Sequence, residues 1–164
     1  MERMRYDYET FVVDIRKLAD TIDEKFDAIV AIARGGMTMA HMLGEYWDIR
    51  KVFVINAIGY DDTQKLGQPN IFNIPDLSTC QNILIVDDIA DSGDTLVAVI
   101  EAFQTHYPTH NFKTATLFYK PTAKFQPDYK LNRADQWIDF FWSEDMKCYN
   151  VSTTESKACY GSND

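Results

Sequence analysis

Apolar residues follow two different periods along this chain, and each period predicts a type of element. Short apolar runs predict buried strands, whereas apolar residues at steps of three and four predict helices with one buried face. The run at 83–86 contains no charge and three β-branched residues, which predicts a strand buried on both faces, as in a parallel sheet. Further strands are predicted at 28–32, 52–57 and 113–119, and helices at 8–22, 37–47 and 96–106.

The stretch from Asn82 to Leu96 combines a strand, two acids, a small polar loop and the start of a helix. Asp87 and Asp88 are predicted to end the strand. Carboxylates accept hydrogen bonds from hydroxyl groups, and Mg²⁺ prefers oxygen ligands. The acidic pair therefore suits the hydroxyls of a ribose or a hydrated Mg²⁺ ion.

The loop between this strand and the next helix has the features of an anion site. Gly93 allows the backbone to approach a ligand, and Ser92 and Thr95 offer hydroxyl groups. The first turn of the helix adds unpaired N–H groups, so the loop predicts capture of a ribose phosphate. The alternative is a simple helix cap by Asp91 or Asp94. Two carboxylates about 4 Å apart repel by roughly 4 kcal/mol at an effective dielectric of 20, so the acidic pair before the loop favours a ligand or cation.

Two further stretches carry candidate binding residues. Ala33-Arg34-Gly35-Gly36 joins a strand to a helix, and its glycines suit either close approach to an anion or a tight turn. The polar stretch from Asp61 to Pro75 predicts a functional loop or a small hairpin. Lys65 in this stretch is either a pyrophosphate contact or a surface lysine. Lys120 follows the last predicted strand, where it suits a carbonyl oxygen or is a solvated lysine before a turn.

Composition narrows the compartment and the partners. The 164 residues suffice for one domain, and 25 acids against 16 bases give a net charge of −9, which disfavours nucleic acid and anionic membranes as partners. Cys80, Cys148 and Cys159 are odd in number and show no C-x-x-C spacing, which favours a reducing, cytoplasmic location over a disulfide framework or zinc site. No apolar run approaches the length of a membrane span.

The sequence V-D-D-I-A-D-S-G-D-T at 86–95 resembles the phosphoribosyl pyrophosphate (PRPP) motif of the type I phosphoribosyltransferases. With A-R-G-G upstream and Lys-Pro and Trp-Ile-Asp downstream, the resemblance extends from Ala28 to about Trp142 and is greatest for members that use 6-oxopurines. It implies an open, mostly parallel twisted sheet flanked by helices, with a mobile hood loop. It also implies transfer of ribose 5-phosphate from PRPP to guanine, xanthine or hypoxanthine, with release of pyrophosphate, in purine salvage.

The same resemblance implies a role for each matching residue. Asp91 should lie beside the purine N7 and Lys120 should bond its 6-oxo oxygen, and these two are the candidate catalytic residues. Trp137 should stack on the ring, although packing in a core is its alternative, and the main chain at Trp137 and Ile138 should contact the 2-substituent. The PRPP site should comprise Arg34, Gly35, Asp87, Asp88, Ile89, Ala90, Asp91, Ser92, Gly93, Asp94 and Thr95.

Details of the motif add further expectations. Asp94 stands where the family commonly has a small or neutral residue, so its side chain must turn away from the phosphate. Gly59 replaces a serine that 6-oxopurine relatives often carry before the tyrosine, which leaves Tyr60 and Lys65 as possible hood contacts. The A-R-G-G loop in relatives often holds a cis peptide that does not involve proline.

The resemblance implies Mg²⁺ as the cofactor, with Asp88 as the metal contact, and a homodimer or homotetramer. We predict one catalytic domain over residues 1–145 and a polar, poorly ordered tail over 146–164. Two alternatives remain from the sequence. One is a phosphoribosyltransferase for another base, such as adenine, and the other is a regulatory protein that binds PRPP or a nucleotide on the same fold.

Overall fold

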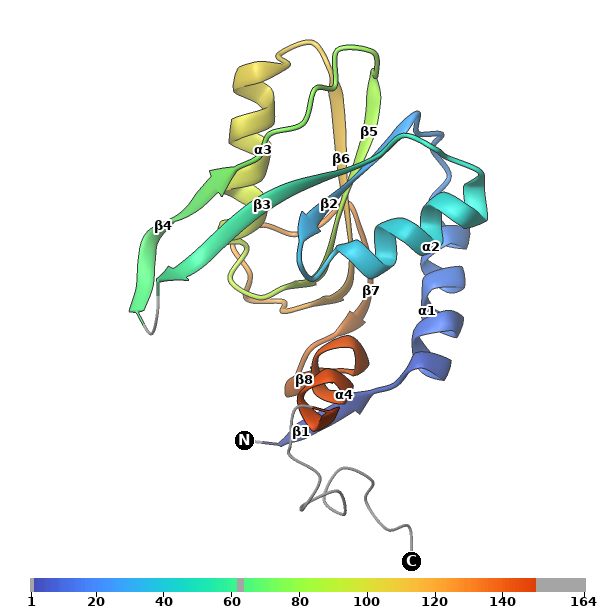
Figure 1. Ribbon diagram of the computed structural model, residues 1–164, viewed down its shortest axis with the longest axis vertical. Coiled ribbons are helices and arrows are strands. Elements are labelled where there is room, and N and C mark those ends of the chain that lie inside the picture. Colours follow the sequence, from blue (N-terminus) through green and yellow to red (C-terminus); the bar gives the residue numbers. More distant parts are fainter. Residues whose placement is uncertain (1, 62–63, 150–164) are drawn as a thin grey trace, which may run out of the picture. The chain divides into compact units, whose positions relative to one another are not determined.

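The computed structural model of this chain describes residues 2–61 and 64–149, and their side chains except those of 60–61, 64–66 and 148–149 (Figure 1). The chain forms two compact units. Of the described residues, the larger contains those between 14 and 133, and the smaller combines 2–13 with 134–149. Within the described residues, none of the helices has the length and apolar character needed to cross a membrane.

A six-stranded sheet forms the larger unit, in the order β4-β3-β2-β5-β6-β7. Only the pair β3–β4 is antiparallel, so the predicted open, mostly parallel sheet is confirmed. The strands are β2 (Ala28–Ala33), β3 (Val52–Asp61), β4 (Gln64–Phe72), β5 (Asn82–Ala90), β6 (Asn111–Tyr119) and β7 (Tyr129–Arg133). The helices are α1 (Tyr8–Thr21), whose first residues belong to the smaller unit, α2 (Met37–Trp47) and α3 (Asp94–His106).

Strand β5 is covered on both faces, as its unbroken apolar run predicts. Ile83 and Ile85 belong to a core cluster that includes Val99 and Phe103 of α3. Leu84 and Val86 point to the other face by strand alternation and are also fully buried. Helix α2 packs against β2, β3 and β5. The carboxyl ends of β2 and β5 therefore lie on a rigid base.

All four predicted strands are longer than predicted, β3 and β5 by four residues or more. Pairing of β5 with β6 continues to Ala90 opposite Tyr119, so Asp87 and Asp88 lie within β5 and do not end it. Strand β3 continues beyond Ala57 because it pairs with β4, with an irregularity between Ile58 and Tyr60. Of the two alternatives for the polar stretch after Asp61, the hairpin is therefore confirmed.

The smaller unit contains β1 (Arg3–Tyr6), β8 (Trp137–Phe140) and α4 (Phe141–Tyr149), none of which the sequence patterns predicted. Strands β1 and β8 pair in parallel, and a bidentate ion pair joins Arg3 to Asp139 at 2.5 and 2.8 Å. An aromatic cluster supports them, formed by Tyr6, Phe11, Phe140, Phe141 and Trp142. Helix α4 covers the first four residues of the predicted tail, and the rest of that tail lies outside the described residues. The single domain over 1–145 stays a prediction.

Candidate active site

Two strand-to-helix loops meet where the neighbouring parallel strands β2 and β5 end. The first, Ala33–Gly36, depends on its glycines for space. A Cβ atom on Gly36 would lie 2.1 Å from the carbonyl oxygen of Val86, and one on Gly35 would lie 2.5 Å from the carboxyl carbon of Asp88. The peptide between Ala33 and Arg34 is cis, as the resemblance implied. The backbone of this loop therefore lies against the carboxyl group of Asp88 and the backbone of Val86.

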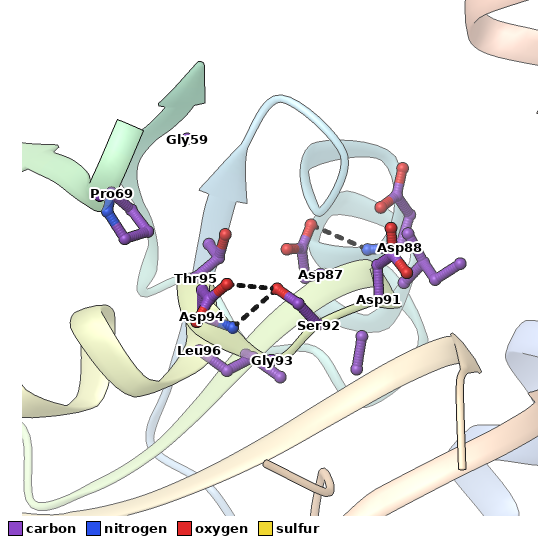
Figure 2. A pocket seen from close by; sticks show the side chains of 13 residues that line it. Gly59, Pro69, Asp87, Asp88, Asp91, Ser92, Gly93, Asp94, Thr95 and Leu96 are labelled. Atoms are coloured by element: carbon purple, nitrogen blue, oxygen red, sulfur yellow. Dashed lines mark hydrogen bonds between the residues drawn. The ribbon is translucent and has the colours of Figure 1, made fainter. Parts of the chain in front are cut away.

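A cavity of about 240 Å³ opens beside the second loop (Figure 2). The segment Asp87–Thr95 lines it without interruption, so the predicted PRPP residues of this segment share one wall. The hairpin β3–β4 contributes Gly59, Gly67 and Pro69 to the lining. Four carboxylates line the cavity. None of the described residues in the lining carries a basic side chain. A phosphorylated ligand must therefore be bound by backbone N–H groups, by a metal cation, or by basic side chains from outside the lining.

The acidic pair is strained electrostatically. Burial and then the charge of Asp88 raise the pKa of Asp87 well above its usual value. Burial likewise raises the pKa of Asp88 to about 6, although hydrogen bonds from backbone N–H groups oppose the rise. The carboxylate of Asp87 accepts a hydrogen bond from the backbone N–H of Asp88 at 3.0 Å (Figure 2). Because the two carboxyl groups resist being ionised at the same time, a bound cation or hydroxyl donors would stabilise their charged forms.

The second loop turns at Gly93, whose φ of +86° is a left-handed conformation that L side chains adopt rarely. A Cβ at Gly93 would also lie 2.7 Å from the backbone nitrogen of Phe125. Gly93 is the N-cap of α3 and no side chain bonds to the cap, so the alternative of a cap by Asp91 or Asp94 is wrong. Residues of the first turn of α3 line the cavity, and the N–H groups of a first turn lack partners within the helix, as an anion site requires.

The carboxylate of Asp94 turns to two neighbours. It accepts a hydrogen bond from the Ser92 hydroxyl at 2.7 Å and forms an ion pair with Lys124. The Ser92 oxygen in turn accepts from the backbone N–H of Asp94 at 3.3 Å (Figure 2). Sequence reasoning missed Lys124, because nothing in Pro-Thr-Ala-Lys-Phe marks it apart from other surface lysines.

The two predicted catalytic residues lie together. The Lys120 ammonium is 2.5 Å from a carboxylate oxygen of Asp91, and the backbone N–H of Lys120 donates to the carbonyl of Ala90 at 2.9 Å. Both side chains remain substantially exposed. A hydrogen-bond donor and an acceptor therefore lie side by side next to the loop from Ala90 to Asp94, the predicted phosphate loop. The edge of a purine that carries the 6-oxo oxygen and N7 requires such a pair.

The described structure does not test the predicted roles of four residues, and the predicted Arg34 and Gly35 do not line the cavity. Trp137 lies on β8 of the smaller unit, 55 % exposed, with the Arg3 guanidinium 6.0 Å from its ring centre, and Ile138 beside it is buried. Tyr60 and Lys65 occupy paired positions on β3 and β4, but their side chains lie outside the described residues. Their roles stay predictions.

The fold and these loops define a phosphoribosyltransferase-type protein, and comparison with known proteins agrees. The phosphoribosyl transferase domain matches residues 6–148, so the chain belongs to that family. It is 35 % identical over 120 residues to the xanthine-guanine phosphoribosyltransferase of Cereibacter sphaeroides, covering 70 % of this chain and 68 % of the relative.

Two solved structures are also similar. The xanthine-guanine-hypoxanthine phosphoribosyltransferase of Helicobacter pylori is 42 % identical, with a TM-score of 0.82 over 89 % of this chain and 97 % of that one. A purine phosphoribosyltransferase of Pyrococcus horikoshii is 31 % identical, with a TM-score of 0.73 over 87 % and 95 %. The predicted family, the open parallel sheet flanked by helices and the enzyme class, a pentosyltransferase of the xanthine-guanine phosphoribosyltransferase type, are confirmed. The mobile hood loop stays a prediction.

Proposed function

We propose that this protein transfers ribose 5-phosphate from PRPP to guanine, xanthine or hypoxanthine and releases pyrophosphate. The observation that carries the proposal is the placement of Lys120 and Asp91, 2.5 Å apart, beside an uninterrupted phosphate loop. The names of the relatives support a purine acceptor. In the reaction the bond from C1 of the ribose to pyrophosphate breaks, and a purine nitrogen bonds to C1.

Each group then has a task that fits its position. The N–H groups from Ser92 to Thr95 bind the 5-phosphate, and Asp87 and Asp88 bind the ribose hydroxyls. Arg34 and Gly35 bind pyrophosphate. The Lys120 ammonium donates to the 6-oxo oxygen, while Asp91 holds the proton of N7. Trp137 and Ile138 keep the tasks implied by the resemblance, stacking and contact with the 2-substituent.

Mg²⁺ fits the donor set as a cofactor. The pair Asp87–Asp88 offers oxygen ligands, and its raised pKa values show that a nearby positive charge would stabilise the ionised forms. Among the described residues no group of three or more metal-ligating side chains exists. Mg²⁺ is commonly held by one or two carboxylates together with substrate phosphates and water, so Asp88 with PRPP is a sufficient set. The ion would supply charge neutralisation of the pyrophosphate leaving group. We therefore expect excess chelator to abolish turnover.

A base-selection assay tests the proposal. Pyrophosphate release is measured with PRPP, Mg²⁺ and each of guanine, xanthine, hypoxanthine, adenine and one pyrimidine. Activity with the 6-oxopurines alone is expected, because a site built around the Lys120 donor leaves that donor unpaired against an amino group. Preference for adenine would overturn the assignment.

The variant Lys120→Ala sharpens the same test. It should lose about 2 kcal/mol or more of transition-state stabilisation on every 6-oxopurine, the worth of a hydrogen bond to a charged group. PRPP affinity, measured by calorimetry, should stay near that of wild type, since the Lys120 ammonium pairs with Asp91 and not with the residues from Ser92 to Thr95. Loss of PRPP binding with unchanged base selectivity would contradict the placement of Lys120.

The remaining parts of the proposal concern the assembly and its compartment. We propose a cytoplasmic homodimer or homotetramer, as the resemblance implies. Light scattering of the purified protein measures the assembly directly.

A further inference from the structure

Asp94 poses a problem for a site that binds phosphate. It is the first residue of α3 and lines the same cavity as Asp87, Asp88 and Asp91. The 5-phosphate of PRPP carries up to two negative charges, and a carboxylate within a few ångströms of it opposes binding. The structure therefore needs a means of neutralising this one side chain.

Lys124 supplies that means. Its ammonium pairs with one carboxylate oxygen of Asp94 while the other oxygen accepts from the Ser92 hydroxyl, so both oxygens of Asp94 have partners within the protein. The Asp94 side chain is only 26 % exposed. The Lys124 side chain is 59 % exposed, so the pair by itself contributes little to stability, and its expected effect is on the charge that a bound phosphate meets.

The position of Lys124 is fixed by the backbone around it. Its N–H donates to the carbonyl of Ser92 at 2.9 Å, and the neighbouring Phe125 is so close to Gly93 that a Cβ there would lie 2.7 Å from the Phe125 backbone nitrogen. The N–H of Lys120, four residues earlier, donates to Ala90. The turn from Lys120 to Phe125 is therefore docked along the phosphate loop from Ala90 to Asp94.

We propose that Lys124 is a positioning residue of the phosphate site, which neutralises Asp94 and holds its carboxylate away from the bound 5-phosphate. The inference rests on the proposed function, since it assigns the ligand of the loop as the 5-phosphate of PRPP. It differs from a direct role, because Lys124 acts on the ligand through Asp94. Removal of Lys124 is then harmful only while the Asp94 carboxylate is present.

A double-mutant cycle tests this dependence. The dissociation constants of PRPP with Mg²⁺, and of ribose 5-phosphate alone, are measured by calorimetry for wild type, Lys124→Met, Asp94→Asn and the double variant. We expect Lys124→Met to weaken both ligands about tenfold or more, and Asp94→Asn to leave affinity within about threefold of wild type or to improve it. The double variant should return to within about threefold of wild type.

Matched variants separate this effect from a loss of structure. Lys124→Arg keeps the charge and should bind as wild type does. Lys113→Met removes a lysine near the start of β6 that pairs with Asp128 at 3.6 Å and with Glu24 at 3.7 Å, and should change neither ligand's affinity. Thermal unfolding verifies that each variant is folded, and Lys124→Gln replaces Lys124→Met in the cycle if the latter is not.

The outcomes distinguish the inference from the proposed function. A double variant as weak as Lys124→Met means direct contact with phosphate and overturns the inference, as does an unchanged affinity in Lys124→Met. Either result leaves turnover of 6-oxopurines by wild type intact. Conversely, the expected cycle in a protein that turns over no purine supports the inference about the loop and overturns the proposed function.

Discussion

The two loops beside the acidic pair are held in their conformations by different physical interactions. The loop Ala33–Gly36 is shaped by sterics, since Gly35 and Gly36 leave no room for a side chain against Asp88 and Val86. The loop Asp91–Thr95 turns at Gly93 and is held by two ion pairs, Lys120 to Asp91 and Lys124 to Asp94, and by a backbone hydrogen bond from Lys124 to Ser92. The first loop should therefore respond to volume, and the second to charge.

This difference suits the chemistry proposed for each loop. A steric loop presents backbone at a fixed place, which is what a pyrophosphate contact through Gly35 requires. A loop held by exposed ion pairs can exchange a protein partner for a ligand, because Lys120 and Asp91 each gain an equivalent partner on a purine. The loop that handles the base is thus the one whose contacts can change during turnover.

The largest effect is expected from a change of charge without a change of volume. Asp91→Asn keeps the shape of the second loop but removes the group proposed to hold the N7 proton. We expect kcat to fall about 10²–10⁴-fold, the usual worth of general acid–base help, with a much smaller change in the KM for PRPP. Steady-state kinetics measure both constants. A wild-type kcat would show that Asp91 only orients Lys120.

The matching change in the first loop adds volume without charge. Gly36→Ala places a methyl group 2.1 Å from the Val86 carbonyl oxygen, a backbone atom that cannot move aside. We expect a loss of about 3 kcal/mol in the free energy of unfolding, at the upper end for overpacking, and the same loss at low and high salt. Urea denaturation at two salt concentrations measures it. A loss that disappears at high salt would contradict the steric account of this loop.

The sequence predicts the positions of these loops well, and the reason is local. Residues 83–96 contain an apolar strand, two acids, a glycine turn and a helix start in direct succession. The cavity lining Asp87–Thr95 can therefore be predicted from the sequence alone. The helix 37–47 was also predicted with its observed ends. Glycine and charge in consecutive positions are signals that need no tertiary information.

What the sequence did not reveal depends on distant partners. Strand β7 pairs with β6 through Tyr129 and Lys130, in a segment with no clear alternation of apolar and polar residues. Strands β1 and β8 are only four residues each and exist because they pair with one another across more than 130 residues of sequence. Lys124 likewise has a role only once the turn at 120–125 docks on the loop at 90–94.

A pH dependence of stability is expected from the acidic pair, whose Asp88 lies against the first loop. Burial raises the pKa of Asp88 from 3.8 to about 6, so the folded protein binds a proton that the unfolded chain has released. Protons bound to the native state make stability fall as pH rises, and the fall is limited to the window between those two values.

In metal-free buffer we therefore expect the Asp88 contribution to decrease across this window, by up to about 1.4 kcal/mol per pH unit. Urea denaturation at several pH values between 4 and 7 is compared between wild type and Asp88→Asn, because the amide does not titrate. The comparison measures the Asp88 contribution together with the change that loss of the Asp88 charge makes to the raised pKa of Asp87. The difference in stability between the two proteins should change with pH inside the window, and parallel curves would contradict a titration of Asp88 there.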